Sequence, residues 1–283
     1  MDRIAVVGGG TMGAGIAEVC GRAGLDVVLV EADEPGAERC RSRIESSIQR
    51  AVRADRISAV EAERALNRID LATDLEATAS ADLVIEAVPE VEQLKVDLFR
   101  RLDPLLRPDA ILASNTSSIP LVKLASATGR PDRVVGVHFF NPAPVLPLVE
   151  IVASLLTSDD TLLAVTDFAE KRLGKTTIRS KDRAGFIVNA LLIPYLLSAI
   201  RMFESGFASA EDIDSGMVQG CAHPQGPLAL ADLIGLDTTA AVAQSMYEEF
   251  KEPLYAPPPL LLRMVDAGLL GRKSGRGFFP YAR

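Results

Sequence analysis

Hydrophobic positions in the first 180 residues alternate between short apolar runs and stretches with helical spacing. Helical spacing follows Met12, charged helical sequence fills Pro35–Arg68 as one or two helices, and leucines recur at helical intervals in Gln93–Leu106. The apolar runs predict buried strands at Ile4–Val7, Val27–Val30, Ala81–Val88, Ala110–Ala113, Val134–Phe139 and Leu148–Val152. Strands that alternate with helices predict an α/β fold, with an open, mostly parallel sheet covered by helices on both faces.

The pattern becomes wholly helical after Lys181–Gly185. The expected helices are Phe186–Glu204, Ala210–Val218, Leu228–Glu249 and Leu260–Ala267. A chain of 283 residues suits two domains, which we place at 1–183 and 184–283. Apolar residues lie on more than one face of the C-terminal helices, so we expect a second subunit to cover them in a homodimer.

Three glycines, Gly8, Gly10 and Gly13, follow the first strand with the spacing G-x-G-x-x-G and open the first helix. In this pattern the first glycine allows a tight turn and the second lets a pyrophosphate approach the backbone. The third lets the helix pack closely on the strand. Exposed N–H groups at the helix N-terminus then bind phosphates. The sequence therefore predicts a Rossmann-type, doubly wound dinucleotide site, although a lone glycine motif of this kind also occurs in incidental turns.

The acid Glu31 closes the second strand. At this position a carboxylate accepts hydrogen bonds from the ribose hydroxyls of the adenosine half. Its charge would repel a 2′-phosphate, and Ala32 and Asp33 provide no arginine, so NAD is expected rather than NADP.

His138 ends the predicted strand Val134–Phe139, and Glu150 lies inside the apolar run Leu148–Val152. A buried carboxylate is costly unless it is paired, so we expect the two side chains to meet. An imidazole oriented by an acid is a general base suited to alcohol oxidation near neutral pH. The alternatives are a core histidine bonded to backbone and a strand acid that faces solvent.

Other polar residues permit two interpretations each. Ser114–Ser118 follows a strand and contacts a ligand, caps the next helix, or does both through different side chains. Asn189 is a polar residue in an apolar helix and is either functional or satisfied within the fold. His223, before proline and glycine, is expected in a turn. No ligand spacing supports a metal site.

Composition excludes several classes. A net charge of −8 argues against nucleic acid and anionic membranes as partners. Cys20, Cys40 and Cys221 are widely spaced and are expected to be reduced, buried thiols. The sequence opens on a strand with no signal peptide before it, and Phe186–Ile200 is too short and polar for a membrane span, so a soluble cytoplasmic protein is expected.

Long stretches of the chain resemble the 3-hydroxyacyl-CoA dehydrogenase family of fatty acid metabolism, and in particular its bacterial 3-hydroxybutyryl-CoA members. The stretches are VVGGGTMGAGIA, VIEAV with Glu90, ILASNTSS, VGVHFFNPAPV with LVEIV, DRAGFIVNALL, HPQGPLALADLIGLDT and LGRKSGRGFFPY. The resemblance implies an N-terminal NAD domain, a C-terminal helical domain for substrate binding and dimerisation, and NAD-dependent oxidation of a 3-hydroxyacyl thioester.

The resemblance also implies roles for single residues. His138 takes the hydroxyl proton, Glu150 orients it, and Ser117 and Asn189 contact the reacting oxygen. The cofactor and substrate cleft is lined by Gly8, Gly10, Thr11, Met12, Gly13, Glu31, Glu90, Lys95 and Asn115.

The carrier end of the substrate is where the chain departs from the family. Val91 follows Glu90 in place of a usual asparagine, Pro147 replaces a common polar residue, and arginines replace the lysines that often meet CoA phosphates, at Arg50, Arg53 and Arg56. An acyl-carrier-protein thioester, such as a glyceryl unit in polyketide extender synthesis, is therefore an alternative substrate. A non-catalytic NAD-binding protein and a relative acting on free hydroxy acids or sugar acids are further alternatives.

Overall fold

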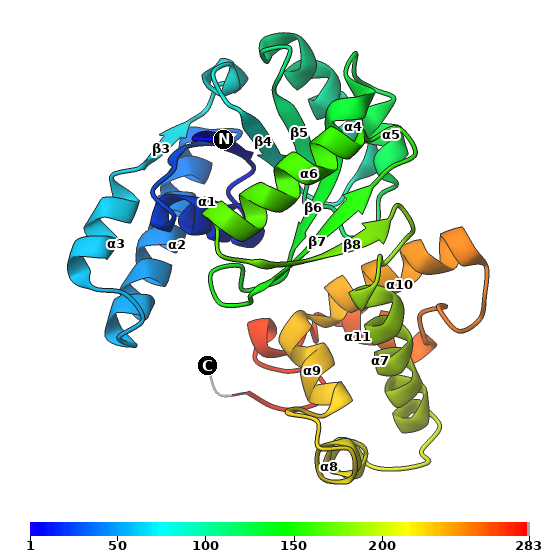
Figure 1. Ribbon diagram of the computed structural model, residues 1–283. Coiled ribbons are helices and arrows are strands. Elements are labelled where there is room, and N and C mark those ends of the chain that lie inside the picture. The colour runs from blue at the N-terminus through cyan, green and yellow to red at the C-terminus, as the bar shows by residue number, and fades with distance from the viewer. Residues whose placement is uncertain (282–283) are drawn as a thin grey trace. The chain divides into compact units, whose positions relative to one another are not determined.

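The chain is divided into two compact units, Met1–Asp182 and the segment from Arg183 onward (Figure 1). The computed structural model describes residues 1–281. Each unit has its own hydrophobic core, one between the sheet and its helices and one among the C-terminal helices.

An eight-stranded sheet forms the centre of the first unit, with the strand order β3-β2-β1-β4-β5-β6-β7-β8. Strands β1 to β6 run parallel to one another, whereas β7 is antiparallel to β6 and β8 is parallel to β7. The predicted mostly parallel sheet is confirmed. The strands are β1 Arg3–Val7, β2 Asp26–Val30, β3 Ile69–Ala72, β4 Leu83–Glu86, β5 Ile111–Ser114, β6 Val134–Phe139, β7 Leu148–Ala153 and β8 Thr176–Lys181.

Helices cover both faces of this sheet. Helices α1 and α6 contribute to one core with alternate strand residues such as Ile111 and Ala113, while α4 and α5 pack on the opposite face (Figure 1). The helices are α1 Thr11–Arg22, α2 Glu34–Arg53, α3 Ala59–Leu66, α4 Glu92–Leu102, α5 Leu121–Ala125 and α6 Asp159–Asp167. The charged segment after β2 thus forms two helices, as the sequence allowed.

The helix starts in the first unit differ in a way that matters for the site. Asp33 caps α2 by accepting a hydrogen bond from Gly36 N at 2.6 Å, and Ser58 caps α3 in a reciprocal capping box with Glu61. Helix α1 begins after Gly10 with no side-chain cap. Its first N–H groups therefore face the glycine turn without a side-chain acceptor.

The second unit is helical: α7 Val188–Glu204, α8 Ala210–Gly220, α9 Pro227–Ile234, α10 Leu236–Phe250 and α11 Pro259–Asp266. Asp232, buried in α9, accepts hydrogen bonds from Phe278 N, Phe279 N and the Tyr281 hydroxyl, each at 3.0 Å. This carboxylate fixes the last described segment of the chain to the helices.

Three details of the sequence analysis are wrong or incomplete. The single helix predicted at 228–249 is two helices, because Gly235 has a φ of 105°, which ends α9. Strands β3 and β8 were not predicted because they lie at the edges of the sheet. Most of their residues are exposed or half-buried, so their apolar pattern is weak. Cys20 and Cys40 are buried, but Cys221 is exposed.

Candidate active site

The glycine turn after β1 has the backbone that a dinucleotide site requires. Gly8 has a φ of 98°, and a Cβ on Gly13 would lie 1.7 Å from the carbonyl oxygen of Gly8. Helix α1 therefore packs against the turn at a distance only glycine permits. A Cβ on Gly10 would meet nothing within 4 Å, so this side of the turn is open to a ligand.

A cavity of about 860 Å³ lies beside this turn. Its lining includes Gly8 and Gly10 from the turn, Thr11 and Met12 from the start of α1, and Glu31, which directly follows β2. Glu31 Oε1 accepts a hydrogen bond from Gly9 N at 2.6 Å, and Oε2 accepts one from Ala32 N at 3.1 Å. A carboxylate can accept about four hydrogen bonds, so Glu31 is fixed in place and keeps capacity for ribose hydroxyls.

His138 and Glu150 face each other across the antiparallel pair β6–β7. The distance from His138 Nδ1 to Glu150 Oε2 is 2.7 Å, and the two side chains are 5% and 0% exposed. On the other side of the ring, Nε2 lies 3.0 Å from Ser117 Oγ. The predicted pairing is therefore present, and Glu150 does not face solvent. Because a carboxylate accepts at Nδ1, the nitrogen left to accept a proton is Nε2.

Glu90 organises the loop that carries Ser117. Its Oε1 accepts hydrogen bonds from Thr116 Oγ1 at 2.5 Å, Ser117 N at 2.9 Å, and Ser118 N and Oγ at 3.1 and 3.0 Å. The serine cluster thus binds an acid rather than capping α5, whose first N–H groups are capped by Asp182 at 2.9 Å. Asn115 Oδ1 accepts a hydrogen bond from Phe139 N at 2.8 Å, which joins this loop to the end of β6.

Lys95 connects Glu90 to a second acid, Glu86, at the end of β4. Lys95 Nζ lies 2.7 Å from Glu86 Oε1 and 3.0 Å from Glu90 Oε2, and its side chain is 1% exposed. Glu86 Oε2 accepts a further hydrogen bond from Ser114 Oγ at 2.6 Å. The sequence analysis placed Lys95 in the cleft lining, whereas the structure buries it beneath the loop. Glu86 had been given no role, and Thr116 had been named only as part of the cluster Ser114–Ser118.

The pKa values of the two acids move in opposite directions. Burial raises the pKa of Glu86, and the charge of Lys95 only partly opposes this effect. For Glu90, burial is outweighed by Lys95 and by the hydrogen bonds from the serine loop, so its pKa is held below the usual range. Glu90 is thus kept as the anion that holds residues 116–118.

Comparison with known proteins decides the family. Residues 3–183 match the family model for the 3-hydroxyacyl-CoA dehydrogenase NAD binding domain, and residues 185–281 match the C-terminal domain of the same family. The chain belongs to the 3-hydroxyacyl-CoA dehydrogenase family. As a member of that family it is an NAD-dependent oxidoreductase.

Relatives of this dehydrogenase cover its whole length. A 3-hydroxybutyryl-CoA dehydrogenase of Mycobacterium tuberculosis H37Rv is 55% identical over 99% of both chains. The crystal structure of M. tuberculosis FadB2 is 55% identical, covers 100% of this chain and 99% of its own, and superimposes with a TM-score of 0.98. The (S)-3-hydroxybutyryl-CoA dehydrogenase of Ralstonia eutropha is 44% identical over 100% of both chains, with a TM-score of 0.93.

Two residues singled out in the sequence lie in the second unit of the dehydrogenase. Asn189 is partly buried in the first turn of α7, and its predicted contact with substrate stays a prediction. His223 lies in the loop before α9, as predicted, and its Nδ1 is 3.1 Å from the Tyr195 hydroxyl.

Residues 1–281 contain neither a candidate membrane span nor a candidate metal cluster. None of the helices there has the length and apolarity to span a membrane. Within the same residues, no group of three His, Cys, Asp or Glu side chains is placed to hold a metal ion.

Proposed function

We propose that this protein oxidises the 3-hydroxyl of a short-chain 3-hydroxyacyl-CoA to the 3-oxo group with NAD, and catalyses the reverse reaction, with His138 as the general base. The observation that carries this proposal is the imidazole held between a buried carboxylate and a serine hydroxyl, at 2.7 and 3.0 Å. Such a clamp fixes both the tautomer and the orientation of the ring.

The proton moves through His138. Bound NAD supplies the hydride acceptor for the hydrogen on C3 of the substrate. As that C–H bond breaks, His138 Nε2 accepts the proton of the 3-hydroxyl, and the C–O bond becomes a carbonyl. Glu150, hydrogen-bonded to Nδ1, stabilises the imidazolium that forms. In reduction, the same nitrogen returns the proton to the oxygen.

Ser117 and Asn189 would orient the reacting oxygen. Ser117 Oγ already lies within hydrogen-bond distance of Nε2, so an oxygen that binds Nε2 also comes within reach of this hydroxyl. Asn189 offers an amide to the same oxygen in this proposal, by the family resemblance of the stretch around it.

The NAD site is assigned to the glycine turn and Glu31. The uncapped N-terminus of α1 with Gly10, Thr11, Met12 and Gly13 would bind the pyrophosphate, and Glu31 the adenosine ribose. In this proposal Glu90 and Asn115 shape the loop beside the nicotinamide, and Lys95 supports Glu90 from beneath.

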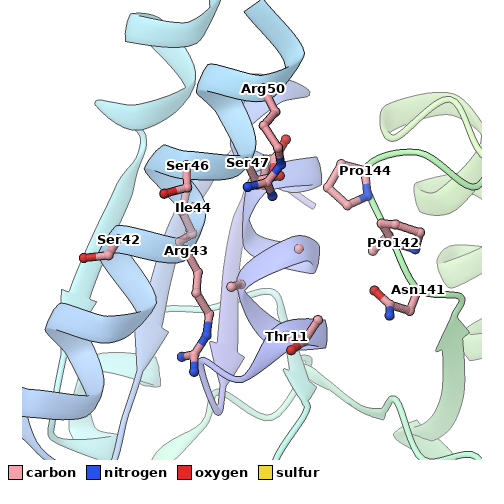
Figure 2. Close-up of a pocket in the computed structure, with 14 residues that line it drawn as sticks. Thr11, Ser42, Arg43, Ile44, Ser46, Ser47, Arg50, Asn141, Pro142 and Pro144 are labelled. Atoms are coloured by element: carbon pink, nitrogen blue, oxygen red, sulfur yellow. The ribbon is translucent and has the colours of Figure 1, made fainter. Parts of the chain in front are cut away.

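A second cavity, of about 510 Å³, would take the pantetheine arm and diphosphate of CoA (Figure 2). We call it the arm cavity. It lies between helices α1 and α2 on one side and residues 141–144 on the other, and Arg43 and Arg50 line it. Figure 2 shows Arg50 from α2 opposite Pro144 across the hollow. These arginines provide the charge expected of a diphosphate site.

The carrier is the point at which a second candidate function remains. Three arginines, Arg50, Arg53 and Arg56, replace the lysines that the family often has in this segment. Arg50 lines the arm cavity, whereas Arg53 lines a separate hollow between α2 and α3. The second candidate is the same oxidation of a hydroxyacyl unit bound to a carrier protein. Such a substrate would place its pantetheine arm in the arm cavity without contacts from these arginines to CoA phosphates.

Steady-state assays test the proposal. We expect the wild-type protein to oxidise 3-hydroxybutyryl-CoA with NAD far faster than with NADP, and faster than the same acyl unit on an acyl carrier protein. Formation of reduced cofactor is the readout. Turnover of the carrier-bound substrate alone would favour the second candidate. Cofactor binding without turnover of any hydroxyacyl substrate, free hydroxy acids included, would contradict both.

The proposal also covers the oligomeric state of the protein and its place in the cell. Several large apolar side chains of the second unit are exposed, among them Leu191 and Phe207 at 74% and 79%. These surfaces support a homodimer formed through the C-terminal helices. We place the enzyme in the cytoplasm, where NAD and CoA thioesters are both present.

A further inference from the structure

A third cavity in the first unit is strongly basic. It has a volume of about 450 Å³ and lies beside the C-terminal end of α1. Its charged lining consists of Glu61 and four cations, namely Arg22, Lys171, Arg172 and Lys175. Glu61 is engaged by Ser58, whose N–H and hydroxyl donate to its Oε2 at 2.7 and 2.8 Å. We call this hollow the basic cavity.

Lys175 is the cation with the least compensation. Its Nζ donates hydrogen bonds to Ala143 O and Leu146 O, both at 2.7 Å, and among the described residues it has no carboxylate partner. An ammonium has three donors, so one remains for a further acceptor. Burial, and then the charge of Arg22, lower the pKa of Lys175. An anion in the cavity would stabilise both cations.

Each of the other three cations has a carboxylate within 4 Å. Arg22 lies 3.3 Å from Glu18, while Lys171 and Arg172 pair with Asp167 and Asp2 at 2.7 and 2.8 Å. The last two pairs are at the surface, where ion pairs contribute little and rearrange readily. Lys171 and Arg172 can therefore turn toward a bound anion.

The basic cavity adjoins the arm cavity. Both are walled by Pro144, and both lie along α1, with Thr11, Gly15 and Glu18 lining the arm cavity and Arg22 the basic one. From Thr11 to Arg22 the helix rises by about 16 Å. Lys175 donates a hydrogen bond to the carbonyl of Ala143, a residue that lines the arm cavity. An extended molecule in the first hollow would thus reach the second.

We propose that the basic cavity binds the 3′-phosphate of CoA, and so selects CoA thioesters over thioesters that lack this group. The inference rests on the proposed function, because it extends the same substrate along α1. A phosphate monoester carries a charge of about −1.5 to −2 near neutral pH and offers three acceptor oxygens, which suits four cationic side chains. A carrier protein presents the same arm without the nucleotide, so it would leave the basic cavity without a ligand.

The test compares acetoacetyl-CoA with acetoacetyl-3′-dephospho-CoA in the reducing direction. For the wild-type enzyme we expect kcat/KM to favour the full CoA ester by about 10- to 100-fold, the range set by one or two charge-assisted hydrogen bonds. We expect Lys175→Met, and Lys171→Gln combined with Arg172→Gln, to reduce this preference by about tenfold or more.

The ratio of the two esters isolates the phosphate. Lys175→Met also removes support from the arm-cavity wall, but a displaced wall slows both esters alike and leaves their ratio unchanged. Arg100→Gln removes one exposed positive charge from α4, outside the cavity, and is expected to keep the wild-type ratio. A wild-type ratio near one, or variants that retain the full preference, would overturn the inference.

Calorimetry separates this inference from the proposed function. If neither ester is turned over, the proposed reaction fails, but the affinities of free CoA and free 3′-dephospho-CoA still decide the site. Tighter binding of CoA that is lost in Lys175→Met supports the basic cavity as a phosphate site. Equal affinities contradict it.

Discussion

Two buried acids, Glu150 and Glu86, position the side chains of the first unit that we propose for catalysis. Glu150 holds the imidazole of His138 directly, while Glu86 acts at one remove, through Lys95 and Glu90, on the loop that carries Ser117. Both acids sit among apolar strand residues and are fully buried. A buried charge is tolerated only with a partner, so each side chain holds its partner in one place.

Lys95→Met tests the series of contacts that runs from Glu86 through Lys95 to Glu90. The substitution leaves two acids without their cation, and we expect a loss of about 3–5 kcal/mol in the free energy of unfolding near neutral pH. The pKa of Glu86 is already raised by burial and rises further without Lys95. The folded variant therefore takes up protons, and its deficit relative to wild type shrinks as the pH falls from about 8 to about 5.5.

Urea unfolding at both pH values measures this effect. Lys123→Met is the matched control, because Lys123 pairs with Glu92 at 2.7 Å but both side chains are about half exposed. The free energy of unfolding of Lys123→Met should fall by less than about 1 kcal/mol. A deficit for Lys95→Met that grows as the pH falls would contradict the assigned role of Glu86.

The sequence was sufficient to predict the partner of Glu150, but it was not sufficient to predict the partner of Glu86. Glu150 and His138 were paired by the argument that an acid in an apolar strand needs a partner, and the antiparallel β6–β7 register brings them together. The same argument applies to Glu86, but its partner Lys95 lies on a helix of mixed polarity. Periodicity gives no reason to bury a lysine until Glu86 and Glu90 are known to converge on it.

At the scale of elements, the strand ends define the site. Strands β1, β4 and β5 run parallel, so their carboxyl ends lie on the same side of the sheet. The glycine turn, Glu86 and Ser114 are all located at these carboxyl ends. The interior strands were predictable because they are continuous apolar runs. The edge strands β3 and β8 were not, and neither was the break at Gly235, which depends on a backbone conformation rather than on side-chain pattern.

Two glycine substitutions in the β1–α1 turn should have different effects. In Gly13→Ala the new Cβ clashes with a carbonyl oxygen, so we expect about 1–3 kcal/mol of destabilisation in spite of the better helix propensity of alanine, together with loss of NAD binding. In Gly10→Ala the Cβ projects into open space, so stability should change by less than about 0.5 kcal/mol.

NAD binding distinguishes the roles of these glycines. Because the Gly10 methyl group would lie where the pyrophosphate approaches, Gly10→Ala should weaken NAD binding by about tenfold or more in a fluorescence titration. Unchanged affinity in Gly10→Ala would place the pyrophosphate elsewhere.

At the scale of the whole molecule, the chain divides its tasks between two units with separate cores. The first contains the cavities assigned to NAD and CoA, and the family models change near the same residues, at 183 and 185. The second keeps large apolar side chains at its surface. A helical unit of this kind gains stability by covering such a surface with another subunit.

Sedimentation equilibrium tests the dimer. The chain has a mass of 30.2 kDa, so we expect a species of about 60 kDa, twice that value, at micromolar concentration. A single species near the mass of one chain would reject the homodimer and leave the exposed residues Leu191 and Phe207 without a partner of this kind.

The most direct test of the account is the turnover number of His138→Gln with 3-hydroxybutyryl-CoA, measured beside its affinity for NAD. Glutamine retains a hydrogen-bonding side chain but cannot take up the proton, so kcat should fall by about 10²–10⁴ while the dissociation constant of NAD stays near the wild-type value. Turnover close to wild type in this variant would contradict the assignment of His138 as the base.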